Sequence, residues 1–206
     1  MPRATLLPTS SPVPARPYRL VAIGGSAGGV PALQDMLSML PADFPIPIAV
    51  VQHLPADWES RLPDVLGFRT RLRCRWAEDG GSPAPCTVHV ARPGANLMLT
   101  PTGRFQHVRG PKPRLGWPSV DVFLESMAGP LGPEAVAVVL SGMLWDGARG
   151  IAAVRRAGGA TMVQHPRDAA HPDMPSAAVD LGRADVQRSP AGIAEALAIL
   201  AERGVE

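Results

Sequence analysis

The sequence contains few of the residues on which several common protein classes depend. Of its 206 residues, 2 are cysteine and 4% are aromatic. Cys74 and Cys86 lie in no paired ligand motif, so we expect neither a disulfide nor a metal site. With 20 basic and 18 acidic residues, the net charge is only +2. This balance, together with the scarcity of aromatic rings for base stacking, argues against nucleic acid as a partner.

Long hydrophobic segments are missing as well. No run approaches the roughly 18 consecutive apolar residues of a membrane-spanning helix, and the first residues lack the apolar core of a secretory signal. We therefore expect a cytoplasmic protein that does not insert into membranes. Residues 1–17 are rich in proline and predict a disordered leader, whereas residues 18–206 are expected to form one domain. The sequence does not set the oligomeric state, for which a monomer is our default expectation.

Strand-like and helix-like segments alternate along most of the chain. This order predicts an α/β fold, with a doubly wound, mostly parallel sheet and helices on both faces. Apolar residues at helical spacing predict helices at residues 31–40, 58–68, 120–128, 147–157 and 191–203. Short apolar runs predict strands from Val21 and at residues 48–52, 71–77, 87–91, 96–100, 135–140, 159–164 and 184–186. Turns within residues 87–106 predict a small antiparallel hairpin insertion there.

The first expected strand ends in a turn that carries a serine. Residues 21–30 read Val-Ala-Ile-Gly-Gly-Ser-Ala-Gly-Gly-Val, and a helical pattern follows directly. Glycines on both sides of Ser26 permit a tight turn that exposes a hydroxyl at the carboxyl edge of a sheet, where open α/β sheets build their sites. Ser26 is therefore a candidate nucleophile. A dinucleotide site is the weaker interpretation, because Ser26 replaces the second glycine of the G-x-G-x-x-G motif.

Two further strand ends supply the other side chains that a nucleophilic serine needs. His53 follows the run at residues 48–52, and Asp146 lies in the loop after residues 135–140. A neutral imidazole can take the serine proton, and a carboxylate fixes the imidazole tautomer, so these residue types predict a Ser-His-Asp triad. The backbone N–H groups of Ala27 and Met143 are candidate donors to an oxyanion, since both lie on turns at this edge.

These residues belong to a wider set of short blocks that occur in order along the chain. The set resembles the catalytic domain of the chemotaxis receptor methylesterase family, CheB, from about Tyr18 to the last expected helix. The blocks are Ile23-Gly24-Gly25-Ser26-Ala27-Gly28-Gly29, Gln52-His53-Leu54-Pro55, Val88-His89-Val90-Ala91-Arg92-Pro93-Gly94, Pro118-Ser119-Val120-Asp121-Val122, Leu140-Ser141-Gly142-Met143, Asp146-Gly147-Ala148 and Met174-Pro175-Ser176-Ala177.

The resemblance implies a protein-glutamate methylesterase that acts on chemoreceptors or related chemosensory proteins, with glutamine deamidation as a second activity. It implies Ser26 as nucleophile, His53 as general base and acid, and Asp146 as the orienting carboxylate. It also implies an oxyanion site at the Met143 backbone, a loop at Met174-Pro175 that borders the active site, and no cofactor.

Two positions depart from the family pattern. Ala27 stands where the family usually has threonine, and Leu144, followed by Trp145, stands where it usually has glycine. Leu144 and Trp145 support one alternative, a non-catalytic interaction module. A serine esterase for another carboxyl ester is a second alternative, because the link to chemotaxis rests on resemblance alone. Because the first catalytic strand follows a short leader, we expect regulation by an attached receiver domain to be absent; an excised fragment is the alternative.

Four arginines alternate in one expected strand. Arg69, Arg71, Arg73 and Arg75 would share one face of an extended segment. Such a run is usually a solvated strand edge, where charge discourages aggregation. The alternative is a docking surface for the acidic methylation helices of receptors, with an attraction that weakens as salt is added.

Overall fold

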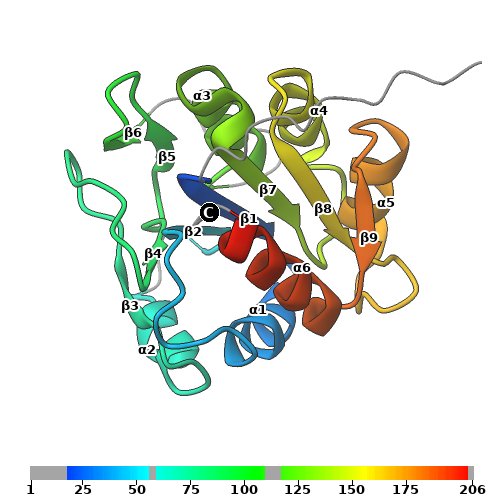
Figure 1. The fold of residues 1–206 in the computed structure, drawn as a ribbon, viewed down its shortest axis with the longest axis horizontal. Coiled ribbons are helices and arrows are strands. Elements are labelled where there is room, and N and C mark those ends of the chain that lie inside the picture. Colours follow the sequence, from blue (N-terminus) through cyan, green and yellow to red (C-terminus); the bar gives the residue numbers. More distant parts are fainter. Residues whose placement is uncertain (1–17, 56–58, 110–116, 204–206) are drawn as a thin grey trace, which may run out of the picture.

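Seven strands form one parallel sheet in the order β3-β4-β2-β1-β7-β8-β9 (Figure 1). The computed structural model describes residues 18–55, 59–109 and 117–203, so the expected leader at residues 1–17 lies outside the described residues. The strands of this sheet are β1 (Leu20–Gly25), β2 (Ile48–Gln52), β3 (Arg73–Trp76), β4 (Thr87–Val90), β7 (Ala135–Val139), β8 (Ala160–Gln164) and β9 (Val186–Arg188). Every pairing within the sheet is parallel, as the alternation of strands and helices predicted.

Helices cover both faces of the sheet, which confirms the predicted α/β class. They are α1 (Gly29–Ser38), α2 (Leu62–Gly67), α3 (Val120–Leu131), α4 (Ala148–Arg156), α5 (Asp173–Asp180) and α6 (Pro190–Arg203), with a 3-10 turn at Gly132–Glu134. Among the described residues, none of these helices combines the length and the hydrophobicity that a bilayer span requires.

The central strands are buried on both faces, and successive side chains enter different cores. In β1, Val21 and Ile23 pack with α1, α2 and α6, whereas Leu20 and Ala22 pack with α3 and α4. This explains why β1 is a continuous apolar run and not an alternating one. In α1, Leu33, Met36 and Leu37 form the buried stripe that the helical spacing predicted.

The predicted antiparallel insertion is shorter than expected. Residues 87–90 form β4, which pairs in parallel with β2 and β3 inside the main sheet. Only β5 (Asn96–Leu99) and β6 (Phe105–Val108) form the antiparallel hairpin, which packs against α3. The turn signals in this region were correct, but they do not state which strand pairs with which, and the buried β-branched residues of β4 are equally suited to a parallel sheet.

The order in which strands are added to the sheet reverses at β1. After β1 the chain forms β2, β3 and β4 on one side of it, and later β7, β8 and β9 on the other side. Strands β2 and β7 therefore flank β1, and the carboxyl ends of all three strands meet at the point where open α/β sheets bind their ligands. The residues that follow β1, β2 and β7 are those of the predicted triad.

Candidate active site

Ser26 lies in the turn after β1, and both its backbone N–H and its backbone carbonyl are hydrogen-bonded. Gly28 has a left-handed φ of 71° and begins α1, which allows the chain to reverse within three residues of the strand. The Ser26 N–H donates to the carbonyl of Ser141 at 3.0 Å, and the N–H of Gly29 donates to the Ser26 carbonyl at 2.9 Å. The Gln52 amide also donates to that carbonyl, at 2.7 Å. With its backbone tied to β2 and to the segment after β7, Ser26 presents its hydroxyl in a defined direction.

His53 lies between the hydroxyl of Ser26 and the carboxylate of Asp146. Its Nδ1 is 3.1 Å from Ser26 Oγ, and its Nε2 is 2.7 Å from Asp146 Oδ2. A carboxylate can only accept, so Nε2 carries the proton and Nδ1 is free to accept from the serine. The His53 side chain is 15% exposed, and its backbone N–H donates to Gly25 at 3.1 Å. The imidazole is therefore held in the tautomer that can remove the Ser26 proton.

Asp146 is buried, and the amino end of α3 supplies most of its hydrogen bonds. Its Oδ2 accepts from the Val120 N–H at 2.8 Å as well as from His53, and its Oδ1 accepts from the Asp121 N–H at 2.9 Å and from the Ser119 hydroxyl at 3.1 Å. Burial by itself raises the pKa of Asp146, but the hydrogen bonds from His53 and from the two backbone N–H groups outweigh it, and the pKa is lowered. The carboxylate is thus charged when His53 needs it.

A second buried carboxylate, Asp121, fixes the loop that carries Asp146. Its Oδ1 accepts from the N–H groups of Gly147 and Gly150, each at 2.9 Å, and its Oδ2 accepts from Arg149 at 3.0 Å. Asp121 therefore joins the first turn of α3 to the first turn of α4. Sequence reasoning did not give Asp121 a role, because its partners Gly147 and Gly150 are 26 and 29 residues away along the chain.

The predicted oxyanion donors are the N–H groups of Ala27, the residue after Ser26, and of Met143, in the turn after β7. In the described part of the chain, the N–H groups of Ala27 and Met143 have no hydrogen-bond partner, whereas the Gly142 N–H donates to the His171 carbonyl at 3.0 Å. Gly142 lies so close to the serine that an added Cβ would be 2.9 Å from Ser26 Cβ. The turn after β7 therefore lies close to Ser26, and the role of the Ala27 and Met143 N–H groups as oxyanion donors stays a prediction.

Exposed apolar side chains border this turn. Met143, Leu144 and Trp145 are each about half exposed, and Leu144 has a left-handed φ of 67°. The Leu144 N–H donates to Asp173 at 3.3 Å, which holds the turn against the start of α5. An L residue is strained in this conformation and glycine is not, so Leu144 adds backbone strain to the turn.

The predicted loop at Met174-Pro175 is helical. Both residues lie in the first turn of α5, where proline is tolerated because the first N–H groups of a helix have no internal partner. The Met174 N–H donates to the Gly142 carbonyl at 2.9 Å, so α5 does border the turn after β7. The border with the active-site turn is thus as the resemblance implied, but a helix forms it in place of a loop.

Comparison with known proteins shows to which family the chain belongs. The family model described as CheB methylesterase matches residues 21–197. The chain belongs to this family. A crystal structure of the Thermotoga maritima CheB methylesterase catalytic domain has 31% sequence identity and a TM-score of 0.84, with 89% of this chain and 98% of that chain covered.

Two curated relatives that this chain matches are longer than this chain. Protein-glutamate methylesterase FrzG of Myxococcus xanthus is 40% identical over 171 residues, which are 83% of this chain and 51% of FrzG. Protein-glutamate methylesterase/protein-glutamine glutaminase 3 of Burkholderia orbicola (strain AU 1054) is 40% identical over 183 residues, or 88% of this chain and 54% of that protein. The chain thus spans about half the length of these relatives and corresponds to the catalytic domain in the solved structure.

Proposed function

We propose that the protein is a serine hydrolase that removes methyl esters from protein glutamates through Ser26, His53 and Asp146. The observation that supports this most directly is the continuous hydrogen-bond chain from the Ser26 hydroxyl through His53 to a buried carboxylate. Membership in the CheB methylesterase family supports the same chemistry.

In the first half of the reaction, Ser26 Oγ attacks the ester carbonyl while His53 Nδ1 takes its proton. The carbonyl oxygen becomes negative and receives hydrogen bonds from the N–H groups of Ala27 and Met143. His53, now protonated at both ring nitrogens, is stabilised by Asp146 and returns the proton to the departing methoxide. Methanol leaves, and the glutamyl group remains attached to Ser26 as an ester.

In the second half, His53 Nδ1 takes a proton from water as the water attacks the acyl-enzyme carbonyl. The bond between the carbonyl carbon and Ser26 Oγ then breaks, and His53 gives the proton to Ser26 Oγ. The products are a glutamate carboxylate and the free enzyme. Deamidation of glutamine follows the same route with ammonia as the leaving group, and we propose it as a second activity. One of the relatives carries both activities in its name.

We further propose that the substrates are methylated chemoreceptors or related chemosensory proteins, and that the protein works in the cytoplasm. Family members act on chemoreceptors. Leu144 and Trp145 are half exposed in the loop that leads to Asp146, so we expect them to affect which residues beside the glutamyl ester are accepted.

Release of labelled methanol from membranes that contain labelled, methylated receptors tests this function. The Ser26→Ala variant should lose at least about 10³-fold in rate while it keeps its fold by circular dichroism. Ser38→Ala is a matched control, because Ser38 is an exposed serine on α1 whose hydroxyl bonds only the local Asp35 carbonyl. Undiminished release by the Ser26 variant would refute the assignment. No release by the folded wild-type protein would favour another ester or a non-catalytic role.

A further inference from the structure

A basic pocket lies at the opposite end of the sheet from the triad. Its volume is about 440 Å³, and Arg73 and Thr87, among the residues that line it, begin β3 and β4. The remaining lining residues are Ala42, Arg71, Leu72, Arg75, Ala84, Pro85 and Cys86. Because the strands are parallel, the amino ends of β3 and β4 point away from the edge that carries Ser26. A ligand in this pocket would therefore not occupy the proposed active site.

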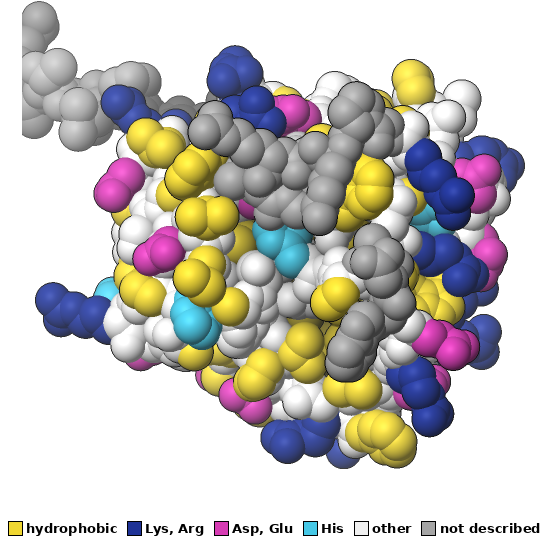
Figure 2. All heavy atoms as spheres, turned by 180° about the vertical axis from the view of Figure 1, so that it is seen from behind, with side chains coloured by type: hydrophobic (Ala, Val, Ile, Leu, Met, Phe, Trp, Pro, Cys, Tyr) yellow, Lys and Arg dark blue, Asp and Glu magenta, His cyan; other side chains and the backbone are white. Residues whose placement is uncertain are grey.

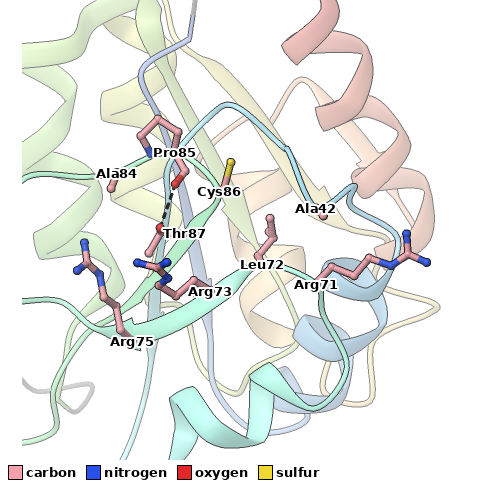
Figure 3. Close-up of a pocket in the computed structure, with 9 residues that line it drawn as sticks. All are labelled: Ala42, Arg71, Leu72, Arg73, Arg75, Ala84, Pro85, Cys86 and Thr87. Atoms are coloured by element: carbon pink, nitrogen blue, oxygen red, sulfur yellow. Dashed lines mark hydrogen bonds between the residues drawn. The ribbon is translucent and has the colours of Figure 1, made fainter.

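The charged residues that line the pocket are all arginines. Figure 3 shows the guanidinium groups of Arg73 and Arg75 on the same side of β3, whereas Arg71 extends in the other direction, beyond Ala42. Arg69 is paired with Asp35 at 3.8 Å, but among the described residues none of the three pocket arginines forms an ion pair with a carboxylate. Figure 2 shows Lys and Arg side chains gathered on the side of the molecule where β3 lies, with some acidic side chains among them.

The outer side of β3 has main-chain groups available for another strand. β3 is the last strand of the sheet and pairs only with β4. The Arg73 N–H donates to the carbonyl of Cys86, the residue before β4, at 3.1 Å, and the N–H of Ala77, the residue after β3, donates to the Val90 carbonyl of β4 at 2.8 Å. Since N–H groups alternate in direction along a strand, those of Cys74 and Trp76 point away from the sheet. Their side chains pack on the core beside α2, which leaves Arg73 and Arg75 on the other face.

The positive charge of Arg73 and Arg75 limits which segments can pair with the outer edge of β3. A second copy of β3 would bring arginines opposite arginines, which destabilises strand pairing. An extended segment with acidic residues at every second position has the same repeat of about 6.6 Å as Arg73 and Arg75, so each carboxylate would face one guanidinium. We propose that the outer edge of β3 binds such an acidic, extended protein segment, which adds to the sheet as an eighth strand with its acidic side chains on the arginine face.

This partner differs from a helical substrate in its backbone geometry. The main-chain bonds to Cys74 and Trp76 require an extended segment, because a helix has satisfied its own N–H and C=O groups. The proposal keeps the docking interpretation of the arginine run, with an acidic strand in place of an acidic helix. Binding at this edge leaves the triad open to its substrate.

Fluorescence anisotropy with the labelled peptide Thr-Glu-Val-Glu-Val-Glu-Thr tests the proposal on the whole chain. The double variant Arg73→Glu/Arg75→Glu should bind at least about tenfold more weakly and should keep the wild-type esterase rate. Arg156→Glu/Arg188→Glu makes the same charge change at exposed arginines of α4 and of the opposite edge strand β9, and should change the dissociation constant less than about twofold.

Altered peptides distinguish strand addition from nonspecific electrostatic attraction. A peptide of the same composition with its three glutamates adjacent should bind more weakly. Backbone N-methylation of one alternate set of residues should abolish binding, while methylation of the other set should have little effect, because only one set faces β3. Equal binding of all these peptides, no binding of the first peptide, or its displacement by tripolyphosphate at equal concentration would overturn the proposal.

Discussion

Replacement of Asp146 by asparagine removes the negative charge of the carboxylate but keeps the size and shape of the side chain. The carboxylate accepts four hydrogen bonds, from His53, Ser119 and the N–H groups of Val120 and Asp121. Asparagine has one acceptor oxygen, and its NH₂ group must face at least one of these donors. The variant therefore loses hydrogen bonds in a buried site, which costs about 1–3 kcal/mol of folding free energy.

The effect on catalysis should be larger than the effect on stability. If the asparagine NH₂ faces His53, Nε2 must accept, and the imidazole proton moves to Nδ1. The nitrogen nearest Ser26 then donates and cannot take the serine proton. The same substitution in other Ser-His-Asp hydrolases lowers kcat by about 10⁴-fold, which equals about 5.5 kcal/mol of transition-state stabilisation.

Methanol release and chemical unfolding of the same preparations measure both quantities. Asp64→Asn is the matched control, because Asp64 is an exposed carboxylate on α2 that pairs only with nearby Arg61. It should change the rate less than about twofold and the unfolding free energy by less than about 1 kcal/mol. If Asp146→Asn retains more than about one tenth of the wild-type rate, then the tautomer argument is wrong.

Three further outcomes follow from the site. The folded pKa of Asp146 is lowered, so its stabilisation is present above about pH 4, where unfolded aspartate ionises, and is lost as the pH falls below that value; denaturant titrations should show a smaller acid loss for Asp146→Asn than for wild type. Gly142→Ala would push a methyl group against the Met174 sulfur and near Ser26 Cβ, so we expect at least about tenfold slower methanol release and about 1–3 kcal/mol lower stability by unfolding. Leu144→Gly removes left-handed strain of about 1–2 kcal/mol and adds about 0.5–1 kcal/mol of unfolded-chain entropy, so its melting temperature should equal or exceed that of wild type; a clear decrease would contradict this account.

Much of the fold was predictable because it depends on local patterns. The continuous apolar run of β1 specifies a strand that is buried on both faces, and the glycines around Ser26 permit the turn that follows. Parallel strands place their carboxyl ends together, so the positions of Ser26, His53 and Asp146 after three such strands were enough to predict that these side chains meet. Each step uses information that lies within about ten residues of the sequence.

Tertiary structure decided what depends on contacts between distant segments. Strand pairing placed residues 87–90 in the main sheet, because an apolar run does not specify its neighbours. The hydrogen bonds of Asp121 to the start of α4 join segments 26 residues or more apart, and no local pattern encodes their distance. The arginine run was visible in the sequence, but only the sheet order shows that β3 is an edge strand. The sequence by itself determined which residues carry charge and chemistry, whereas folding determined which of them face one another, since packing acts through space and not along the chain.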